Sequence, residues 1–342
     1  MVNVQTNAYE AVAGMILGYR QTALIYVAAR LRVFDALKPG PLGIDELARQ
    51  VGALPEPLHR VLRGVTNLQL LQELDDGRFA LAPAGELLRS QAGSGLHGMA
   101  VYMGGLSAKA YTGLFESVRD GGVAFDRAFG SGFYEYLKTD PELNDAYNKT
   151  LAFGGAAAIM LLHGYDFAGI GTLVDVGGAD GTLACAILAA HVQMKGIVFD
   201  KPEFVQAAEP QICAAGLSAR CTVAPGDFFE SVPTGGDAYL LARIITNWSE
   251  ERALQILGNC RRAMQVGSKL LVVEQVRPER VEPGNMAIEG DLNVFAHLGG
   301  RVRTELEFGD LLARAGFQLD RAIPLAPVLR RGFHVLESSI RA

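Results

Sequence analysis

The chain of 342 residues has no excess of positive charge and no long apolar run. Lys plus Arg total 31 against 37 for Asp plus Glu, so the net charge is -6 and a phosphate backbone is disfavoured as the main partner. The best apolar candidate, residues 154–162, is far shorter than the roughly 20 residues that a membrane-spanning helix needs. We therefore expect neither nucleic acid nor a membrane as a partner.

Secretory and disulfide signals are also missing. Residues 1–10 are polar and lack the basic start and apolar stretch of a signal peptide. The four cysteines show no Cys-x-x-Cys spacing, which predicts free thiols in a reducing cytoplasm and no metal site. Hydrophobic residues make up 49% of the chain, so it can bury large cores, and its length indicates two domains.

The first half of the chain has helical patterning. Residues 11–37 carry apolar side chains among alanines and glycines, and a helix of this kind packs either on a second copy or inside its own domain. Residues 44–50 and 57–74 predict two further helices. A turn at 75–78, followed by Phe79 and Leu81, completes the pattern of a winged helix.

A winged helix can place one helix in the major groove of DNA. Here the candidate recognition helix offers only His59, Arg60 and Arg63 as basic groups, and leucines dominate its apolar face. We therefore favour a dimerisation and lid module over DNA binding. Further helices are expected over 96–167, which gives a mostly helical N-terminal domain at 1–168 and a second domain at 169–342.

Strands alternate with helices in the second domain, which predicts parallel pairing and an α/β fold with a doubly wound, Rossmann-like sheet. The expected strands are 173–176, 196–199, 221–224, 238–245 and 269–274, and the expected helices are 183–190, 204–215 and 250–264.

A glycine-rich turn follows the first of these strands. Asp175, Gly177, Gly178 and Gly181 lie between the strand and the next helix. Glycine lets the backbone come close to a ligand, and the carboxyl edge of an open α/β sheet is where nucleotides bind. The spacing does not match the G-x-G-x-x-G of dinucleotide sites and suits S-adenosylmethionine better.

Two acidic residues at later strand ends support a nucleotide site. Asp200 ends the second strand and can accept hydrogen bonds from both ribose hydroxyls, although it can also merely cap a helix that begins at Pro202. Asp227 follows the third strand and can accept from an exocyclic amine, while the ring of Phe228 covers a purine face.

At this point the whole chain resembles the class I S-adenosylmethionine-dependent O-methyltransferases of the caffeate and hydroxyindole type, including their bacterial natural-product branch. The matching stretches are VDVGGADG at 174–181, FDKP at 199–202, GDFF at 226–229, Asn247-Trp248, LLVVEQV at 270–276, GGRVRTELEF at 299–308 and AGF at 315–317.

The resemblance implies an obligate homodimer whose N-terminal domain closes the pocket over a small-molecule acceptor. It also implies a second domain that binds S-adenosylmethionine. The residues implied for the cofactor are Asp175, Gly177, Gly178, Asp200, Lys201, Gly226, Asp227, Phe228, Arg243 and Trp248, and those implied for the substrate are Asn148, Leu151 and Asn293.

The sequence departs from this family at the catalytic base. Most members have His-Asp-Trp after the fourth strand, whereas this chain has Thr246 in the position of the histidine, and a threonine hydroxyl is far too weakly basic to act alone near pH 7. Glu274 matches one supporting acid of the family, and Val302 replaces the other. Ala242 replaces a common lysine, and Ala179 a common glycine.

Three residues remain as candidates around the reacting atoms: Thr246, Asn247 and His297. His297 lies on a helix that lines the substrate pocket in relatives, so it can take or orient a proton, but it can equally be a helix-end histidine bonded to a backbone carbonyl. The iron-binding histidine pattern of some relatives keeps one of its three ligands here, so we expect no metal.

The sequence therefore predicts a cytoplasmic methyltransferase of antibiotic or other secondary metabolism. Its acceptor is expected to be aromatic or polyketide-like, methylated at oxygen first, with nitrogen or carbon as alternatives. Because the histidine is replaced, a second hypothesis is a family member that binds the cofactor but catalyses hydroxylation or a pericyclic cyclisation. A third, a winged-helix transcription factor with a vestigial enzyme domain, is disfavoured by the negative charge.

Overall fold

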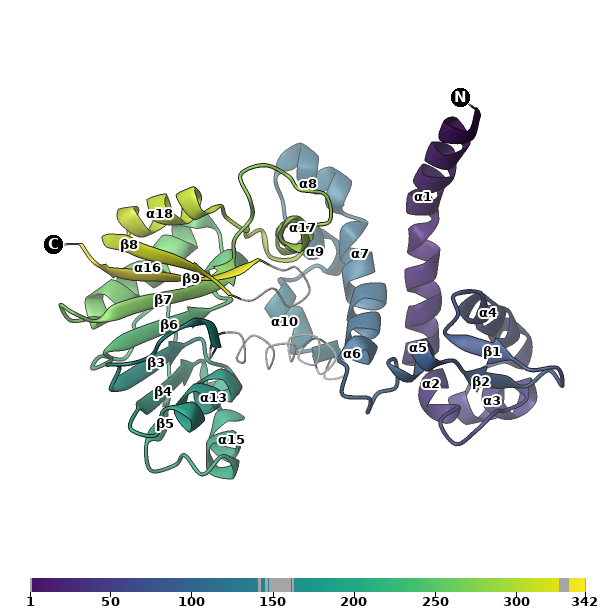
Figure 1. Ribbon diagram of the computed structural model, residues 1–342, viewed down its shortest axis with the longest axis horizontal. Coiled ribbons are helices and arrows are strands. Elements are labelled where there is room, and N and C mark those ends of the chain that lie inside the picture. Colours follow the sequence, from purple (N-terminus) through teal and green to yellow (C-terminus); the bar gives the residue numbers. More distant parts are fainter. Residues whose placement is uncertain are drawn as a thin grey trace. The chain divides into compact units, whose positions relative to one another are not determined.

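A computed structural model describes residues 2–140, 143, 144, 147, 161, 163–325 and 332–341. The chain divides into two compact units. The first holds Met1–Phe115 and Phe125–Phe153, and the second holds Glu116–Ala124 and Gly154–Ala342. Each is described by itself below (Figure 1).

Helices and one short hairpin make up the described part of the chain up to residue 140. They are α1 Val2–Arg30, α2 Val33–Ala36, α3 Ile44–Val51, α4 Pro55–Asn67, β1 Leu71–Glu73, β2 Phe79–Leu81, α5 Pro83–Glu86, α6 Leu96–Val101, the π-helix η1 Tyr102–Ser107, α7 Ala108–Tyr111, α8 Leu114–Asp120, α9 Ala124–Phe129 and α10 Phe133–Leu137.

The core of the first unit forms where α2, α3 and α4 pack with the end of α1 and the hairpin. On α4, Leu58, Leu62 and Val65 recur at helical spacing and are buried. The prediction that this helix runs to residue 74 is wrong, because Gln69 has a left-handed backbone (φ 60°) and Leu71 pairs with Leu81 in the hairpin.

Helix α1 buries only its C-terminal end. Ala28 and Ala29 are buried, whereas large apolar side chains nearer the N-terminus, among them Met15 (78% exposed) and Ile16 (68%), are open to solvent. The predicted single helix over 11–37 is in fact two, because Arg32 takes a left-handed conformation (φ 59°) between α1 and α2.

The stretch Asn7–Arg30 of α1 has the length and apolar composition of a membrane-spanning helix. The expectation that no segment approaches such a length is therefore wrong, since only Glu10, Arg20 and Arg30 interrupt it with charge. Length and composition alone are weak evidence for a membrane span, and an exposed apolar helix face is also what a protein partner covers.

A sheet of seven strands, ordered β5-β4-β3-β6-β7-β9-β8, forms the centre of the second unit (Figure 1). The strands are β3 Thr172–Val176, β4 Lys195–Asp200, β5 Cys221–Pro225, β6 Ala238–Ala242, β7 Lys269–Gln275, β8 Phe317–Pro324 and β9 Phe333–Ile340. The five strands expected from the sequence pair in parallel, as predicted. The antiparallel strands β8 and β9 were not predicted.

Helices cover both faces of this sheet (Figure 1). They are α13 Thr182–Ala190, α14 Pro202–Val205, α15 Ala208–Ala214, the 3-10 turn η2 Ile245–Asn247, α16 Glu250–Ala263, α17 Met286–Leu298 and α18 Glu305–Arg314. Along β3, Leu173 joins the core under α13 and α15, and Val174 joins the opposite core under α16 and α18. Alternate side chains thus build a three-layer α/β unit.

Two predicted elements have different bounds in the structure. The strand expected over 238–245 ends at Ala242, because Arg243 adopts a left-handed backbone (φ 60°) that turns the chain into η2. The helix expected over 204–215 is two short helices, α14 and α15. The early end of β6 matters for function because it places Thr246 in a turn rather than in the sheet.

Candidate active site

The order of the strands reverses between β3 and β6. From β3 the sheet continues through β4 and β5 on one side, and β6 and β7 lie on the other. In open parallel sheets, ligands bind beside the carboxyl ends of the strands at such a reversal. The predicted residues Gly177, Asp200, Asp227 and Thr246 all follow or end these strands, so they share this edge.

The glycine turn after β3 has no room for side chains. Gly177 has φ 80°, and a Cβ atom there would come within 2.5 Å of Ile244 Cδ1. At Gly178 a Cβ atom would lie 2.8 Å from the Oδ2 atom of Asp175. The N–H groups of both glycines donate to the carbonyl of Phe199, at 2.7 and 3.2 Å, which ties this turn to the end of β4.

Ala179 also lies in a left-handed conformation (φ 46°), where the family commonly has glycine. Such a backbone costs a residue with a Cβ atom roughly 1–2 kcal/mol. The conformation is held by a hydrogen bond from the Ala179 N–H to Asp200 Oδ2 at 3.0 Å. The strain is therefore coupled to the orientation of the Asp200 carboxylate.

Asp175 is buried at the end of β3, with 2% of its surface exposed. Burial, and then the negative charges of Asp200 and Asp180, raise its pKa to about 7. Within the described residues its Oδ2 atom has no hydrogen-bond partner. A buried oxygen without a partner is costly, so this position suits a ligand that brings a donor.

Asp200 is arranged as an acceptor. Its Oδ1 atom accepts from the Lys201 N–H at 2.7 Å and its Oδ2 atom from Ala179, which leaves further lone pairs on both oxygens. Neither bond comes from the N–H groups of α14, which begins at Pro202, so the carboxylate does not cap that helix. Burial raises its pKa above the ordinary value.

The turn after β5 carries the predicted adenine-binding residues. Asp227 accepts the Phe229 N–H at 2.8 Å and pairs with Lys201 Nζ at 3.2 Å. Gly226 lies against the Phe199 ring, which a Cβ atom would approach within 2.5 Å. This turn is anchored to α16 by Asn259, which donates to the Phe228 carbonyl at 2.7 Å.

Three aromatic rings gather beside this turn. The centroids of Phe228 and Trp248 are 6.1 Å apart and those of Phe229 and Trp248 are 4.7 Å apart, both edge to face. The guanidinium of Arg252 lies 3.7 Å from the Phe229 centroid. Phe228 and Trp248, which the sequence assigns to the cofactor, thus lie together.

Thr246 lies in η2 and is bonded to Glu274 on β7. Its N–H donates to Glu274 Oε1 at 3.2 Å, and its hydroxyl donates to Oε2 at 2.9 Å. Glu274 is buried, with 1% of its surface exposed, and burial raises its pKa to about 7 against the opposing effects of the Thr246 hydrogen bonds and of Arg243. A buried acid and a hydroxyl therefore form a hydrogen-bonded pair in the turn after β6.

Asn247 directly follows Thr246 in sequence, and His297 lies on α17, after Glu274. His297, on α17, has its Nδ1 atom 2.7 Å from the carbonyl of Asn293, and burial lowers its pKa. Burial therefore disfavours the charged form of the ring, while the Asn293 carbonyl fixes its orientation. Asn247 donates from Nδ2 to the Arg243 carbonyl at 3.0 Å, across the turn that ends β6.

The segment after α17 packs on the same turn. Arg301 donates its N–H to the Thr246 carbonyl at 3.0 Å, and a Cβ atom on Gly300 would come within 2.7 Å of the Asn247 carbonyl carbon. Val302 is buried, and its N–H donates to Asp291 Oδ1 at 2.7 Å. The side chain at position 302 is therefore apolar and enclosed.

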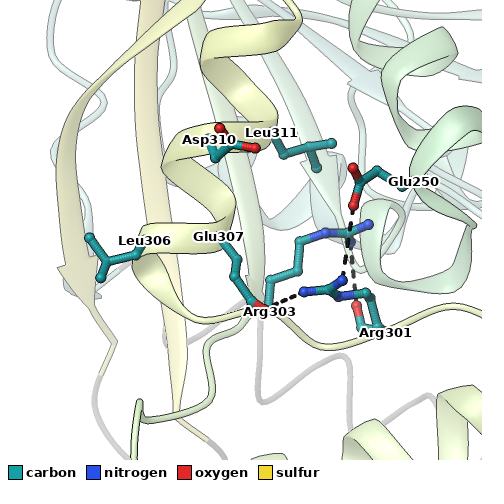
Figure 2. Close-up of a pocket in the computed structure, with 7 residues that line it drawn as sticks. All are labelled: Glu250, Arg301, Arg303, Leu306, Glu307, Asp310 and Leu311. Atoms are coloured by element: carbon teal, nitrogen blue, oxygen red, sulfur yellow. Dashed lines mark hydrogen bonds and ion pairs between the residues drawn. The ribbon is translucent and has the colours of Figure 1, made fainter.

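Figure 2 shows a cavity of about 310 Å³ beside this segment, lined by Glu250, Arg301, Arg303, Leu306, Glu307, Asp310 and Leu311. Arg301 bonds Glu307, and Arg277 pairs with the same carboxylate at 2.8 Å. Glu250 pairs with Arg314. The ion pairs of Arg301, Arg277 and Arg314 with Glu307 and Glu250 thus fix this segment.

Sequence reasoning did not single out this network. The sequence feature that indicates this segment is the Thr304-x-x-Glu307 spacing of a capping box. In the structure the Thr304 hydroxyl accepts the Glu307 N–H at 3.2 Å, and the Glu307 carboxylate accepts the Thr304 N–H at 2.8 Å. The substrate residues Asn148 and Leu151 lie outside the described residues. Among the described residues no group of three or more His, Cys, Asp or Glu side chains could hold a metal ion.

The comparisons with known proteins identify the family. An O-methyltransferase domain matches residues 111–318, and an O-methyltransferase dimerisation domain matches residues 14–91. The chain belongs to this O-methyltransferase family. The family is S-adenosylmethionine-dependent, and the mixed α/β fold with its helical dimerisation domain is that of the class I methyltransferases, as the sequence predicted.

Individual relatives align over nearly the whole chain. The phenazine O-methyltransferase of Lysobacter antibioticus is 37% identical, covering 91% of this chain and 92% of its own. The structure of mitomycin 7-O-methyltransferase superposes with a TM-score of 0.93 at 29% identity, covering 99% of this chain and 100% of that one. An O-methyltransferase from neocarzinostatin biosynthesis has been solved in complex with S-adenosylmethionine and 2-hydroxy-5-methyl naphthoic acid. It superposes with a TM-score of 0.82 at 29% identity, covering 94% of this chain and 96% of that one.

Asp200→Asn tests the acceptor role of this carboxylate. We expect the affinity for S-adenosylmethionine to fall about 10- to 100-fold, since a hydrogen bond to a charged group contributes about 1.5–3 kcal/mol. Isothermal calorimetry measures the change. The matched control is Asp237→Asn, because Asp237 also accepts two backbone N–H groups, from Gly171 and Thr172, but lies at the opposite edge of the sheet. Equal losses in the two variants would contradict the assignment.

Thr304→Ala tests the capping box. We expect the free energy of unfolding to fall by about 1 kcal/mol, as for other N-cap threonines, because the Glu307 N–H loses its acceptor. Urea denaturation measures the difference, and Thr304→Ser should keep most of the stability. A serine variant as unstable as the alanine variant would show that the methyl group of Thr304, rather than its oxygen, matters.

Proposed function

We propose that the protein transfers a methyl group from S-adenosylmethionine to a hydroxyl of a small aromatic or polyketide-like acceptor in natural-product biosynthesis. The observation that carries this proposal is the shared edge at the ends of β3, β4 and β5, where a glycine cradle, two acids and an aromatic cluster lie together. The similarity of the chain to a phenazine O-methyltransferase and to mitomycin 7-O-methyltransferase supports this acceptor class. Nitrogen or carbon acceptors are the alternatives.

The residues present fit the cofactor. Gly177 and Gly178 permit the tight turn at this edge, and Asp175 Oδ2, which has no partner among the described residues, offers an acceptor beside them. Asp200 would accept from the ribose hydroxyls, and Asp227 from the adenine amine. The positive sulfonium of the bound cofactor supplies an already activated methyl group. Lys201, Gly226, Phe228, Arg243 and Trp248 are assigned to the same site.

The acceptor would be positioned by Asn247, His297 and Asn293, with Asn148 and Leu151 assigned by resemblance. Since donor and acceptor held in line can supply up to roughly 7–11 kcal/mol of the barrier reduction, loss of the histidine base does not prevent methyl transfer. The second candidate is a cofactor-binding enzyme that hydroxylates or cyclises without transferring methyl, and Thr246 in the histidine position is the feature that favours it.

A homodimer in the cytoplasm is the assembly that we propose, and the four free thiols are compatible with a reducing compartment. The residues matched by the dimerisation domain include the part of α1 whose apolar side chains are exposed. Covering such a face with a second copy removes it from water at about 25 cal/mol per Å². The winged-helix-like hairpin and helices would then serve dimerisation rather than DNA binding.

Methyl-labelled cofactor tests the proposed reaction. The wild-type protein is incubated with it and a panel of phenols, naphthols and hydroxyphenazines, with aniline and C-nucleophile analogues beside them. We expect label in a phenolic product and S-adenosylhomocysteine in equal amount, both measured by mass spectrometry. An acceptor that is converted without label would reject methyl transfer in favour of the second candidate.

Ile16→Glu tests the dimer. A charge on the exposed face of α1 should shift the protein from dimer to monomer, because each copy would bury a carboxylate against apolar surface. Light scattering after size-exclusion chromatography measures the mass, and Ile16→Met, which keeps the face apolar, is the control. A wild-type protein that elutes as a monomer at micromolar concentration would contradict the assembly.

A further inference from the structure

The Thr246 hydroxyl has a fixed orientation. A hydroxyl has one proton and two lone pairs, and here the proton is committed to Glu274 Oε2 at 2.9 Å. The neighbouring bond, from the Thr246 N–H to Oε1 at 3.2 Å, clamps the other carboxylate oxygen. The oxygen of a hydroxyl that donates its proton still carries two lone pairs, so Oγ1 can also accept a proton.

The surroundings of Glu274 are mostly apolar strand residues. Among the described residues, the charged or titratable groups that face it are Arg243 just after β6, Arg303 before α18, and His334, which is its cross-strand neighbour on β9. The ring of His334 is directed to the Gly332 carbonyl at 3.0 Å. Thr246 is thus the hydroxyl that connects this buried carboxylate to the turn at the carboxyl edge.

We propose that Glu274 takes up the proton of the acceptor hydroxyl through Thr246, as a two-step relay that replaces the histidine base. This inference rests on the proposed function. Thr246 Oγ1 would contact the acceptor, and Glu274 acts through it without contacting the acceptor itself.

The relay balances in protons and electrons. The bond between the acceptor oxygen and the methyl carbon forms as the methyl–sulfur bond breaks, and the sulfur keeps that electron pair. The acceptor proton moves to Thr246 Oγ1 while the proton of Oγ1 moves to Glu274 Oε2. Glu274 ends neutral, and it returns its proton to solvent after the product leaves.

The relay also limits the class of acceptor. Burial holds the pKa of Glu274 at about 7, which is a suitable value for a base at neutral pH. A phenol, with a pKa near 10, can lose its proton to such a base as the methyl group arrives, whereas an aliphatic alcohol is far too weak an acid. The acceptor is therefore a phenolic hydroxyl.

The pH profile distinguishes this relay from a structural role. Only ionised Glu274 can accept the proton, so kcat/KM for a phenol that is neutral at the assay pH should rise with pH up to about 7 and then level off. In Thr246→Val and Glu274→Gln the rise should disappear, and kcat/KM at pH 8 should fall about 100-fold, the lower range of general-base contributions. Thr246→Ser should restore most of the activity and the wild-type profile.

A second acceptor gives a matched internal control. A nitro-substituted phenol that is already ionised at pH 8 has no proton to lose, so Thr246→Val should lower its kcat/KM by less than about 5-fold. Ser268→Ala controls for the loss of a buried hydroxyl, because Ser268 donates to the Gly236 carbonyl at 2.9 Å away from the site. Cofactor affinity, measured by calorimetry, should be unchanged in all variants.

The outcomes separate the two ideas. If the wild type transfers no label to any acceptor, the proposed function fails and the relay with it. If the wild type methylates phenols but Thr246→Val keeps its rate and profile, the relay alone is overturned. The relay is also overturned if Thr246→Val lowers kcat/KM by the same factor for the neutral phenol and for the ionised phenol. Should Glu274→Gln fail to fold, the comparison of Thr246→Val with Thr246→Ser on the two phenols decides.

Discussion

Three buried carboxylates lie along the carboxyl edge of the sheet, and the cost of burying them determines how the site is built. Asp175, Asp200 and Glu274 are each at most 8% exposed, and burial is the first cause of the raised pKa of each. A buried acid is stable only if it is protonated or receives hydrogen bonds. Asp200 receives two hydrogen bonds from the backbone, and Glu274 receives two from Thr246. The Oδ2 atom of Asp175 receives none from a described residue.

Backbone strain at this edge follows from the same requirement. Ala179 and Arg243 both have a left-handed backbone although they carry a Cβ atom. Ala179 lies three residues after β3, and Arg243 directly follows β6. The Ala179 N–H is turned toward Asp200, and the Arg243 carbonyl is turned toward Asn247. Strain of this kind persists where surrounding contacts fix it, and it is concentrated at functional sites. The turns after β3 and β6 thus direct backbone groups into the site at the expense of local stability.

The sequence predicted the parallel sheet and its acidic edge because both follow from local rules. Strand and helix periods alternate, and the carboxyl ends of parallel strands meet at one edge, so Asp200 and Asp227 could be placed near Gly177 without coordinates. The end of β6 could not be predicted, since an arginine gives no signal for a left-handed backbone. The antiparallel strands β8 and β9 were missed because β9 pairs with β7 across a long sequence separation. The pairing of Thr246 with Glu274 joins the turn after β6 to β7, which are far apart in sequence, and needed the structure.

The replacements at 246 and 302 have a common physical consequence. A histidine at 246 would itself accept the proton, and a second carboxylate at 302 would help to stabilise the resulting imidazolium. With threonine there, the charge to be stabilised is no longer an imidazolium, and another carboxylate near Glu274 would raise the pKa of Glu274 further by like-charge repulsion. Arg243 and Arg303 favour the ionised form of Glu274. In the proposed relay the basic group is therefore a buried carboxylate on β7, reached through a hydroxyl of the turn, rather than an imidazole in the turn itself.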